Sequence, residues 1–391
     1  MPSLPLALAL LSLAVWVYLL VLRGGFWRSA ERLGPAAPPA RWPAVTAVVP
    51  ARNEADVIGD SLGSLLAQDY PGPLAVILVD DHSDDGTAAA AEAAAAASGR
   101  AGRFTLLQAA PLPPGWTGKL WALHQGSQRA APESEFLWFS DADIRQPPDA
   151  LARLVAKAEA EKRDLVSLMV ALSCNGFWER LLIPPFIYFF QKLYPFAWVK
   201  DPQRKMAAAA GGCVLVRRAA LQRIGGVAAI RDALIDDCTL AAAVKASRPA
   251  DSGGIWLGLA EEARSIRPYV GLRVIWDMVA RSAYNQLKHS PPLLAGTLAG
   301  MVLTYLVPPA LLLAWPWHGD TAAALLGAAT WLLMAGSLLP TLKLYGQPAW
   351  LAPLLPVAAA LYSAMTFDSA LRHWRGKGGQ WKGRVQDRHA G

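Results

Sequence analysis

Acidic side chains follow three short apolar runs of this 391-residue sequence, at the point where each run ends. The segments are Pro50-Ala51-Arg52-Asn53-Glu54 after residues 45–49, Asp80-Asp81-His82 after 75–79, and Ser140-Asp141-Ala142-Asp143 after 136–139. If the runs are parallel strands, their carboxyl ends lie at one edge of the sheet, where α/β proteins bind ligands. Carboxylates gathered there repel one another unless a cation or hydrogen-bond donors neutralise them. The pattern predicts a site for a divalent cation and an anionic ligand.

Asp141 and Asp143 form the sharpest motif of the three. At an extended strand end, residues i and i+2 point to the same side. Both carboxylates can therefore reach one Mg²⁺ or Mn²⁺ ion, which prefers oxygen ligands, while phosphate oxygens complete its shell. An isolated Asp-x-Asp pair is common, so the acidic ends of the neighbouring runs are what favour a metal site here.

Asp80 and Asp81 have two interpretations. Aspartates in loops usually cap a turn. At a strand end they could instead accept hydrogen bonds from a ribose hydroxyl or a base N–H, which would orient a nucleotide. Gly86 permits the tight reversal that follows, and Thr87 is placed to begin a helix.

Lys119 ends the stretch Gly115-Trp116-Thr117-Gly118-Lys119. The spacing of a P-loop is absent and Leu120 follows the lysine, so we exclude a P-loop. At the start of a helix Lys119 can meet a diphosphate, because its charge and the N-terminal amides both favour anions. A solvated surface lysine is the alternative.

The second half of the sequence adds further candidates. Residues 207–213, which include Gly212, lack bulky side chains; they either pack tightly or leave room for a sugar or acceptor beside the backbone. Asp236 and Asp237 begin a predicted helix, where the helix dipole favours an acid and where a general base could also lie. Arg281 precedes an apolar segment and could stabilise a departing diphosphate or contact lipid phosphate.

Short apolar runs alternate with helical stretches from about residue 44 to 260, and these elements would position the side chains. The predicted strands are 45–49, 75–79, 104–107, 136–139 and 165–170. The predicted helices are 56–67, 87–97, 119–130, 149–161 and 238–246. This alternation is typical of an α/β fold with an open, mainly parallel sheet and helices on both faces.

Long apolar segments at both ends of the sequence predict a membrane protein. Hydrophobic residues make up 54% of the chain and charged residues 17%. The segments without a charged side chain are 1–22, 291–317, 321–342 and 344–367, each close to the ~20 residues that cross a bilayer as a helix. No cation precedes the first segment and no convincing cleavage site follows it, so we expect an uncleaved anchor rather than a signal peptide.

Basic residues cluster after the first apolar segment and after the last one. This placement is expected of cytoplasmic flanks beside anionic lipid. Despite the net charge of +7, the cations form no single basic face with interleaved aromatics, so we expect no nucleic-acid partner. The three cysteines form no C-x-x-C pair and are expected to be reduced thiols in a cytosol-facing domain.

The expected organisation has five parts. They are a transmembrane anchor (1–22), a basic and Pro-rich linker (23–43), an α/β domain (44–290), a C-terminal transmembrane region (291–371) and a basic cytoplasmic tail (372–391). Residues 177–199 are aromatic and apolar but interrupted by Pro184, Pro185 and Pro195, and we expect an in-plane interfacial segment there. Three spans after a cytoplasmic domain would place the basic tail outside, so one segment, with 345–356 as the candidate, is expected to be shallow or re-entrant. The number of spans stays open.

Read in order, the motifs P-A-R-N-E, V-D-D-x-S-x-D-G-T, D-A-D and D-D resemble those of the family 2 glycosyltransferases of GT-A fold. The membrane anchors, the G-W-x-G-K stretch and the tail segment at 379–384 narrow the resemblance to one group within this family. Residues 1 to about 388 are similar to the hopene-associated glycosyltransferases of bacterial hopanoid gene clusters, which are related to ceramide glucosyltransferases. The resemblance implies a GT-A domain, Rossmann-like with a mainly parallel sheet, on the cytoplasmic side of the bacterial inner membrane.

The resemblance also implies roles for the site residues. Pro50, Arg52, Asn53, Glu54, Asp80 and Asp81 would contact the nucleotide, and Asp141 would bind the sugar or ribose. Lys119 and Gly212, chosen from the residues themselves, complete the predicted nucleotide-sugar site. Asp143 would ligate the metal with Asp141 beside it, and Asp237 would be the catalytic base. Asp236 stands where the family's E-D pair has Glu. The family's Q-x-x-R-W motif is not intact: Arg281 is its nearest match and no Trp follows, which disfavours a processive polymer synthase.

The implied reaction is a single-step inverting transfer from a nucleotide-sugar, with a UDP-sugar as first choice, to a hydroxyl of a membrane lipid such as a hopanoid. A polyprenyl-phosphate sugar transferase is one alternative, because a phosphate acceptor needs little base assistance. A non-catalytic nucleotide-sugar-binding membrane scaffold is another, but Asp141, Asp143 and Asp237 argue against it because a scaffold needs no base. A transporter is disfavoured because the apolar segments lack interior charges.

Overall fold

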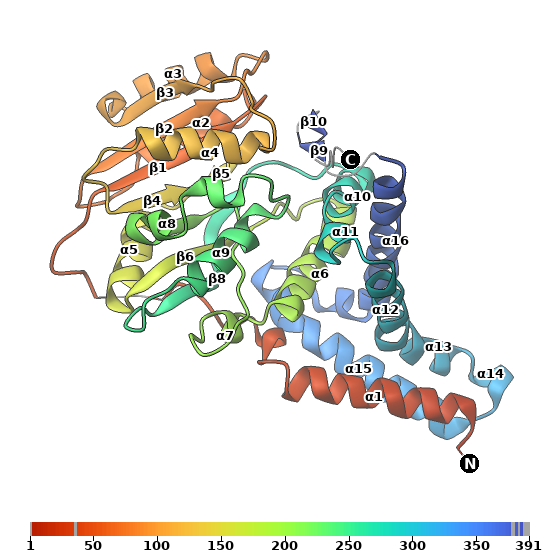
Figure 1. The fold of residues 1–391 in the computed structure, drawn as a ribbon. Helices are drawn as coiled ribbons and strands as arrows, with labels where there is room; N and C mark the ends of the chain where they lie inside the picture. The colour runs from red at the N-terminus through yellow and green to blue at the C-terminus, as the bar shows by residue number, and fades with distance from the viewer. Residues whose placement is uncertain (1, 35–36, 377–379, 382–383, 386–391) are drawn as a thin grey trace.

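The structure, a computed structural model, describes residues 2–34, 37–376, 380–381 and 384–385. An α/β domain lies beside a group of long helices formed by both ends of the chain (Figure 1). Most of the predicted basic tail, including part of its 379–384 segment, lies outside the described residues. The two short strands β9 (Gln380–Trp381) and β10 (Arg384–Val385) pair antiparallel.

Eight strands form one mixed sheet in the order β3-β2-β1-β4-β7-β6-β8-β5. They are β1 (Val45–Ala51), β2 (Leu74–Asp80), β3 (Phe104–Gln108), β4 (Phe136–Phe139), β5 (Ile144–Arg145), β6 (Arg163–Ala171), β7 (Val214–Arg217) and β8 (Gly254–Ser265). The β3-β2-β1-β4 half is parallel, as is the β6–β8 pair, whereas β7 runs antiparallel to both β4 and β6. All five predicted strands are present, and the α/β fold class is confirmed.

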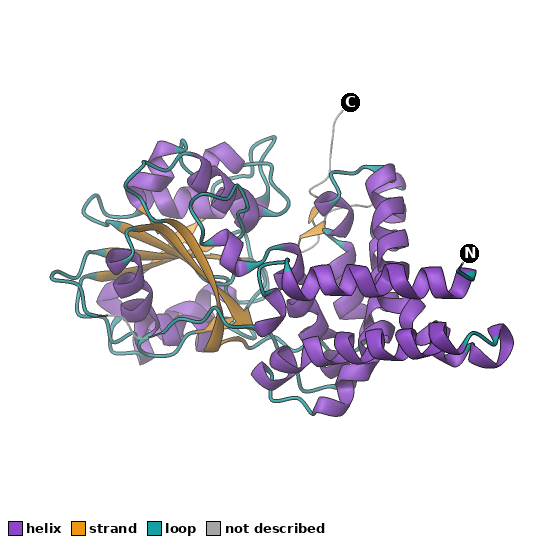
Figure 2. Ribbon diagram, turned by 90° about the horizontal axis from the view of Figure 1, so that it is seen from below, coloured by secondary structure: helices purple, strands orange, loops and turns teal. Residues whose placement is uncertain are grey.

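Helices cover both faces of this sheet (Figure 2). In the α/β domain they are α2 (Ile58–Leu66), α3 (Thr87–Ala97), α4 (Gly118–Arg129), α5 (Ala150–Ala160), α7 (Phe196–Val199), α8 (Arg218–Arg223) and α9 (Asp236–Ala246). Short 3-10 turns lie at Ala101–Arg103 and Val227–Ile230. Side chains alternate along β1, so Val49 belongs to an apolar cluster with residues of α2, α3 and α5, whereas Val48 belongs to a second cluster with residues of α4 and α9. The predicted alternation of strands and helices is confirmed.

The prediction that prolines interrupt the segment 177–199 is wrong for Pro184 and Pro185. Helix α6 (Phe177–Leu193) runs through Pro184 and Pro185 without interruption. Each proline removes one helical hydrogen bond, but both side chains are buried, as are Ile183 and Ile187 beside them. Packing on this face therefore outweighs the lost bonds. Its location at a membrane interface stays a prediction.

Four helices are long and apolar enough to cross a membrane: Leu4–Val21, Pro291–Leu313, Thr321–Leu344 and Ala349–Trp374. Their elements are α1 (Leu4–Val21), α12 (Pro291–Met301), a π-helical turn (Val302–Leu306), α13 (Val307–Leu313), α15 (Thr321–Leu344), a 3-10 turn (Ala349–Leu354) and α16 (Leu355–Trp374). Three shorter helices accompany them: α10 (Leu272–Ala280), α11 (Ala283–Gln286) and α14 (Trp315–His318). A 3-10 turn, Phe26–Arg28, links α1 to the α/β domain.

Candidate active site

The loops after β1 and β2 are fastened to each other at the carboxyl edge of the sheet. Ala51 and Asp80 are register partners at the ends of the two strands. Beyond them, the Arg52 guanidinium donates to the Asp81 carbonyl at 2.5 Å, and the Asn53 backbone N–H donates to Ser83 Oγ at 3.0 Å. The two predicted acidic segments therefore form one rigid corner.

Asp80 and Asp81 are both buried within this corner. The Asp80 carboxylate accepts hydrogen bonds from the backbone N–H and the hydroxyl of Ser83, which closes the turn. The Asp81 carboxylate lies 3.7 Å from the Arg52 guanidinium and 3.3 Å from the His82 ring. The turn-capping interpretation therefore describes Asp80, and a contact of either aspartate with a nucleotide stays a prediction.

A cavity of about 200 Å³ opens beside this corner. Its lining residues are Pro50, Glu54, Thr117, Lys119, Asp141, Ala142, Asp143, Ala233, Leu234, Asp236, Arg267 and Arg281. A smaller hollow shares Pro50, Lys119, Asp141 and Asp236 with it and adds Gly211 and Asp237. Eight of the sequence-predicted site residues thus meet at one place: Pro50, Glu54, Lys119, Asp141, Asp143, Asp236, Asp237 and Arg281. Neither lining includes Arg52, Asn53, Asp80, Asp81 or Gly212.

Lys119 connects the carboxylates of this cavity. Thr117 caps α4 by accepting from the Leu120 N–H at 3.4 Å, which places Lys119 in the first turn. Its ammonium group lies 2.9 Å from an Asp141 oxygen and 3.1 Å from an Asp236 oxygen. Burial alone would lower the pKa of Lys119, but the two carboxylates outweigh burial and raise it. The side chain is a fixed cation facing the place where an anionic ligand would lie.

Asp141 and Asp143 both line the cavity, as their i, i+2 spacing predicted. Burial and the nearby charge of Asp141 raise the pKa of Asp143, which shows that the two carboxylates interact. Among the described residues, no group of three or more His, Cys, Asp or Glu side chains could hold a metal. Mg²⁺ is commonly held by one or two carboxylates plus substrate phosphates, so this pair fits a cation that arrives with a diphosphate.

Asp237 directly follows Asp236 at the start of α9. Its two oxygens accept backbone hydrogen bonds from Gly211 at 2.9 Å and from Cys238 at 2.7 Å. Burial and the adjacent Asp236 charge raise the pKa of Asp237 to about 6, against the opposing effect of Lys119. A carboxylate with this pKa is ionised at pH 7 yet more basic than an exposed aspartate, as a general base requires.

The glycine that faces the cavity is Gly211 rather than the predicted Gly212. A Cβ built on Gly211 would lie 3.0 Å from Lys119 Nζ and 3.6 Å from an Asp237 oxygen. At Gly212 it would instead meet the Val170 side chain at 2.9 Å. Gly212 thus packs against the core. The run of small residues therefore both packs tightly, at Gly212, and leaves room beside the backbone, at Gly211.

Arg267 was missed by the sequence analysis. It follows β8, whose carboxyl end joins the same edge of the sheet because β8 runs parallel to β6. Its guanidinium forms ion pairs with Glu54 and with Asp56 at 3.5 Å, and it lies 3.9 Å from Asp143. The apolar run at 255–260 is the signal that would have revealed this strand, which ends two residues before Arg267.

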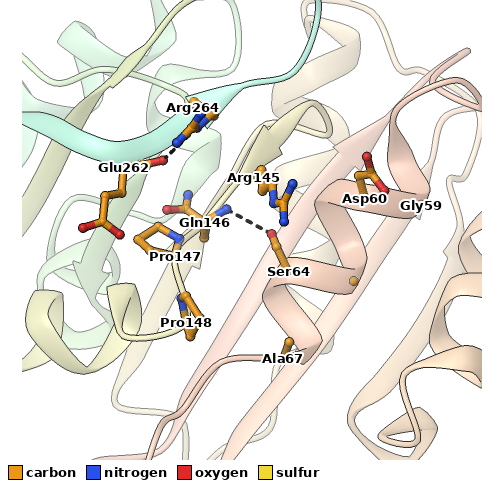
Figure 3. A pocket seen from close by; sticks show the side chains of 11 residues that line it. Gly59, Asp60, Ser64, Ala67, Arg145, Gln146, Pro147, Pro148, Glu262 and Arg264 are labelled. Atoms are coloured by element: carbon orange, nitrogen blue, oxygen red, sulfur yellow. Dashed lines mark hydrogen bonds between the residues drawn. The ribbon is translucent and has the colours of Figure 1, made fainter.

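A hollow of about 590 Å³ lies at a different place, between α2 and the strands β5 and β8 (Figure 3). In this view Arg145, Asp60 and Ser64 border it, and the Gln146 backbone N–H donates to Ser64 Oγ at 3.0 Å. None of the predicted site residues lines it. Its mixture of opposite charges indicates no particular ligand.

An eight-stranded mixed sheet with acidic loops at one edge defines a protein of the GT-A class. Residues 46–225 match the family model described as glycosyl transferase family 2. This part of the chain is therefore a family 2 glycosyltransferase domain, and the resemblance read from its motifs is confirmed at that level. No curated protein sequence matches the chain.

The chain is also similar to solved structures. A mannosyltransferase from Pyrobaculum calidifontis in complex with GDP-Man and Mn²⁺ is 24% identical, with a TM-score of 0.56, and the match covers 96% of this chain and 100% of that one. A glucosyl-3-phosphoglycerate synthase from Mycobacterium tuberculosis is 17% identical over 63% of this chain and 80% of that one, with a TM-score of 0.40. At 24% identity, the likeness to the mannosyltransferase shows the fold alone.

Proposed function

We propose that the protein transfers a sugar from a nucleotide diphosphate-sugar to a hydroxyl of a membrane lipid, with inversion at the anomeric carbon. The main support is the cavity at the carboxyl edge of the sheet. Three cations, Lys119, Arg267 and Arg281, line this cavity together with the carboxylates of Asp141 and Asp143. Cations beside a pair of carboxylates suit a diphosphate and its divalent metal. The family 2 domain supports the same class of reaction.

Asp141 and Asp143 would hold Mg²⁺ or Mn²⁺, which supplies positive charge to the diphosphate as it leaves. The chain's own residues supply the rest of the stabilisation. Lys119 is held at the first turn of α4 by its two ion pairs, and Arg281 lines the cavity from the end of α10. Fixed cations in a partly buried site stabilise developing negative charge without reorganising.

Asp237 is the proposed base. Backbone N–H groups of Gly211 and Cys238 fix its carboxylate, and burial raises its pKa to about 6. It would take the proton of the acceptor hydroxyl while that oxygen attacks the sugar from the face opposite the diphosphate. General-base assistance of this kind typically contributes ~10²–10⁴-fold in rate.

A lipid acceptor is supported by the position of Arg281. It follows α10, which packs with α6 and α16 in one apolar cluster. The cavity is thus bordered by a segment that packs on a candidate membrane helix. The resemblance to the hopene-associated glycosyltransferases favours a hopanoid or related lipid, a UDP-sugar donor and a bacterial inner membrane.

The test uses the full chain purified in detergent. We would supply UDP- and GDP-linked sugars with Mg²⁺ or Mn²⁺ and add membrane lipid extract as acceptor. Lipid-dependent release of nucleoside diphosphate, with the sugar recovered on a lipid, is the expected result. Absence of lipid-dependent release with every donor would overturn the proposal. Transfer to a lipid phosphate that persists in Asp237→Asn would instead identify a polyprenyl-phosphate sugar transferase.

A further inference from the structure

The two oxygens of the Asp237 carboxylate are held by backbone N–H groups from two separate segments of the chain. Gly211, in the loop before β7, donates to one oxygen at 2.9 Å, and Cys238, in the first turn of α9, donates to the other at 2.7 Å. The carboxylate therefore points in a fixed direction only while the two segments keep a fixed distance from each other. A contact that joins these segments would act on the proposed base without touching the reactants.

The Cys238 side chain joins the two segments. Its thiol donates to the Ala209 carbonyl at 3.6 Å, and Ala209 lies two residues before Gly211. The side chain is buried, and burial raises the pKa of the thiol well above its usual value, so the group keeps its hydrogen for this bond. A thiol is a weak donor, so this bond alone would hold the two segments only loosely.

Tyr194, at the carboxyl end of α6, supports the thiol. Its hydroxyl forms a hydrogen bond with the Cys238 side chain. Its ring packs on Phe190, one helical turn earlier, with the ring centroids 5.2 Å apart, and this contact sets the position of the ring. Burial raises the pKa of Tyr194, so the phenol stays neutral and can donate.

Gln286 determines which way the Tyr194 hydroxyl points. The Gln286 amide N–H donates to the Tyr194 oxygen at 2.6 Å. This bond uses the phenol as an acceptor, so the phenol hydrogen is available for the Cys238 sulfur. The thiol hydrogen then goes to the Ala209 carbonyl. Amide, phenol, thiol and carbonyl thus form one chain in which each group donates to the next, and the bonds of such a chain strengthen one another.

This chain of hydrogen bonds connects α11 to the proposed base. Gln286 is the last residue of α11, whose Tyr284 backbone N–H donates to Ser369 of α16 at 3.0 Å. Neither Gln286 nor Tyr194 lines the cavity, whereas Arg281, five residues before Gln286, does. One short segment therefore reaches the site in two ways, through Arg281 at the cavity and through Gln286 at the support of the base.

We propose that Tyr194 and Gln286 are positioning residues for Asp237. They hold the Cys238 side chain in place, and with it the two N–H donors that orient the carboxylate toward the acceptor hydroxyl. This inference rests on the proposed function, because it needs Asp237 to be the base. The chain of hydrogen bonds includes none of the residues proposed to hold the metal or the diphosphate. Its loss should therefore lower the rate of transfer without weakening donor binding.

The first test removes single members of the chain. Tyr194→Phe keeps the ring, and we expect kcat to fall about tenfold with the donor KM within about a factor of two, because a small displacement of a reacting group is costly in rate. Gln286→Met keeps the length of the side chain without its N–H donor and should give a loss of the same size. Tyr188→Phe is the matched control, because Tyr188 lies on the same helix and loses a buried hydrogen bond of 2.7 Å to Ser337. This control should lower Tm as much as Tyr194→Phe does and leave kcat unchanged.

An unchanged kcat in Tyr194→Phe would overturn the inference. Equal losses of kcat in Tyr194→Phe and Tyr188→Phe would also overturn it, because they would follow from lost stability alone. A higher donor KM with an unchanged kcat would show that Tyr194 acts on donor binding and not on the base. An unsubstituted protein without lipid-dependent transfer would refute the proposed function and this inference together, whereas the preceding outcomes, in an active protein, refute the inference alone.

The second test asks whether Tyr194 acts through Asp237. In Asp237→Asn the base is already lost, so adding Tyr194→Phe should lower the residual rate by less than about twofold. The residual rates would be measured with enzyme in excess over acceptor, and binding of the nucleoside diphosphate, measured by calorimetry, should be equal in the single and the double variant. A further loss of about tenfold in the double variant would show that the two residues act independently and would contradict the proposal.

Discussion

The ammonium group of Lys119 lies 3.1 Å from a carboxylate oxygen of Asp236, which joins the start of α4 to the start of α9. The two helices are separated by more than a hundred residues of sequence. Because Asp236 directly precedes Asp237, this ion pair fixes the proposed base relative to the proposed diphosphate site. One lysine therefore couples leaving-group stabilisation to the position of the base.

Replacing Lys119 tests this coupling. Lys119→Gln leaves Asp141 and Asp236 without their shared cation, so we expect kcat/KM for the donor to fall by about 100-fold. Steady-state kinetics with varied donor would measure the loss. Lys157→Gln, which removes an ion pair with Glu161 on α5, is the matched control and should leave the kinetics unchanged. Equal kinetics in both variants would remove Lys119 from the mechanism.

Asp237→Asn tests the base. The amide keeps the shape of the side chain but cannot take a proton, so we expect kcat to fall by ~10²–10⁴-fold. Binding of the nucleoside diphosphate, measured by calorimetry, should stay within a factor of a few. Asp232→Asn, an exposed aspartate five residues earlier, is the control. Normal turnover in Asp237→Asn would exclude this residue as the base.

The raised pKa of Asp237 predicts an acid limb in the pH profile. A base must be deprotonated to act, so kcat/KM should fall as the pH drops below about 6, approaching tenfold per pH unit. Above that pH the carboxylate is ionised and the profile should be flat with respect to this group. An acid limb centred near pH 4 would mean that the reacting carboxylate is an unperturbed one.

Metal removal tests the Asp141–Asp143 pair. Chelation with EDTA should abolish transfer, and added Mg²⁺ or Mn²⁺ should restore it. In Asp143→Asn one of the two carboxylates is lost, and we expect the metal concentration for half-maximal activity to rise at least about tenfold. Asp149→Asn, at the start of α5, is the control. Undiminished transfer in EDTA would show that the reaction needs no divalent cation.

Arg267→Gln tests the residue that only the structure identified. The variant loses the ion pairs with Glu54 and Asp56 and the charge near Asp143, so the corner formed after β1 loses its link to β8. We expect the donor KM to rise by about tenfold or more, with partial rescue by Arg267→Lys. Arg264 lies in β8, shortly before Arg267, but borders the hollow of Figure 3, so Arg264→Gln should behave as the unsubstituted protein. An unchanged donor KM in Arg267→Gln would assign Arg267 no part in donor binding.

Local sequence was sufficient for the parallel half of the sheet. Runs such as 75–79 and 136–139 are apolar at every position because both faces of a central strand are buried. The acidic residues that follow these runs could be placed together because parallel strands end at one edge of the sheet. The antiparallel strand β7 was not predicted because it follows the run of small residues at 207–213 directly, with no helical stretch between them to mark another strand of the alternation.

The sequence by itself determined the α/β class, the acidic edge and the four apolar segments, because burial and charge at these positions follow from residue type and local period. Only the tertiary structure decided that Lys119 meets Asp236, that Gly211 and not Gly212 faces the cavity, and that Arg267 completes it. These relationships join residues distant in the chain, and pairing of that kind depends on how whole elements pack rather than on any local pattern.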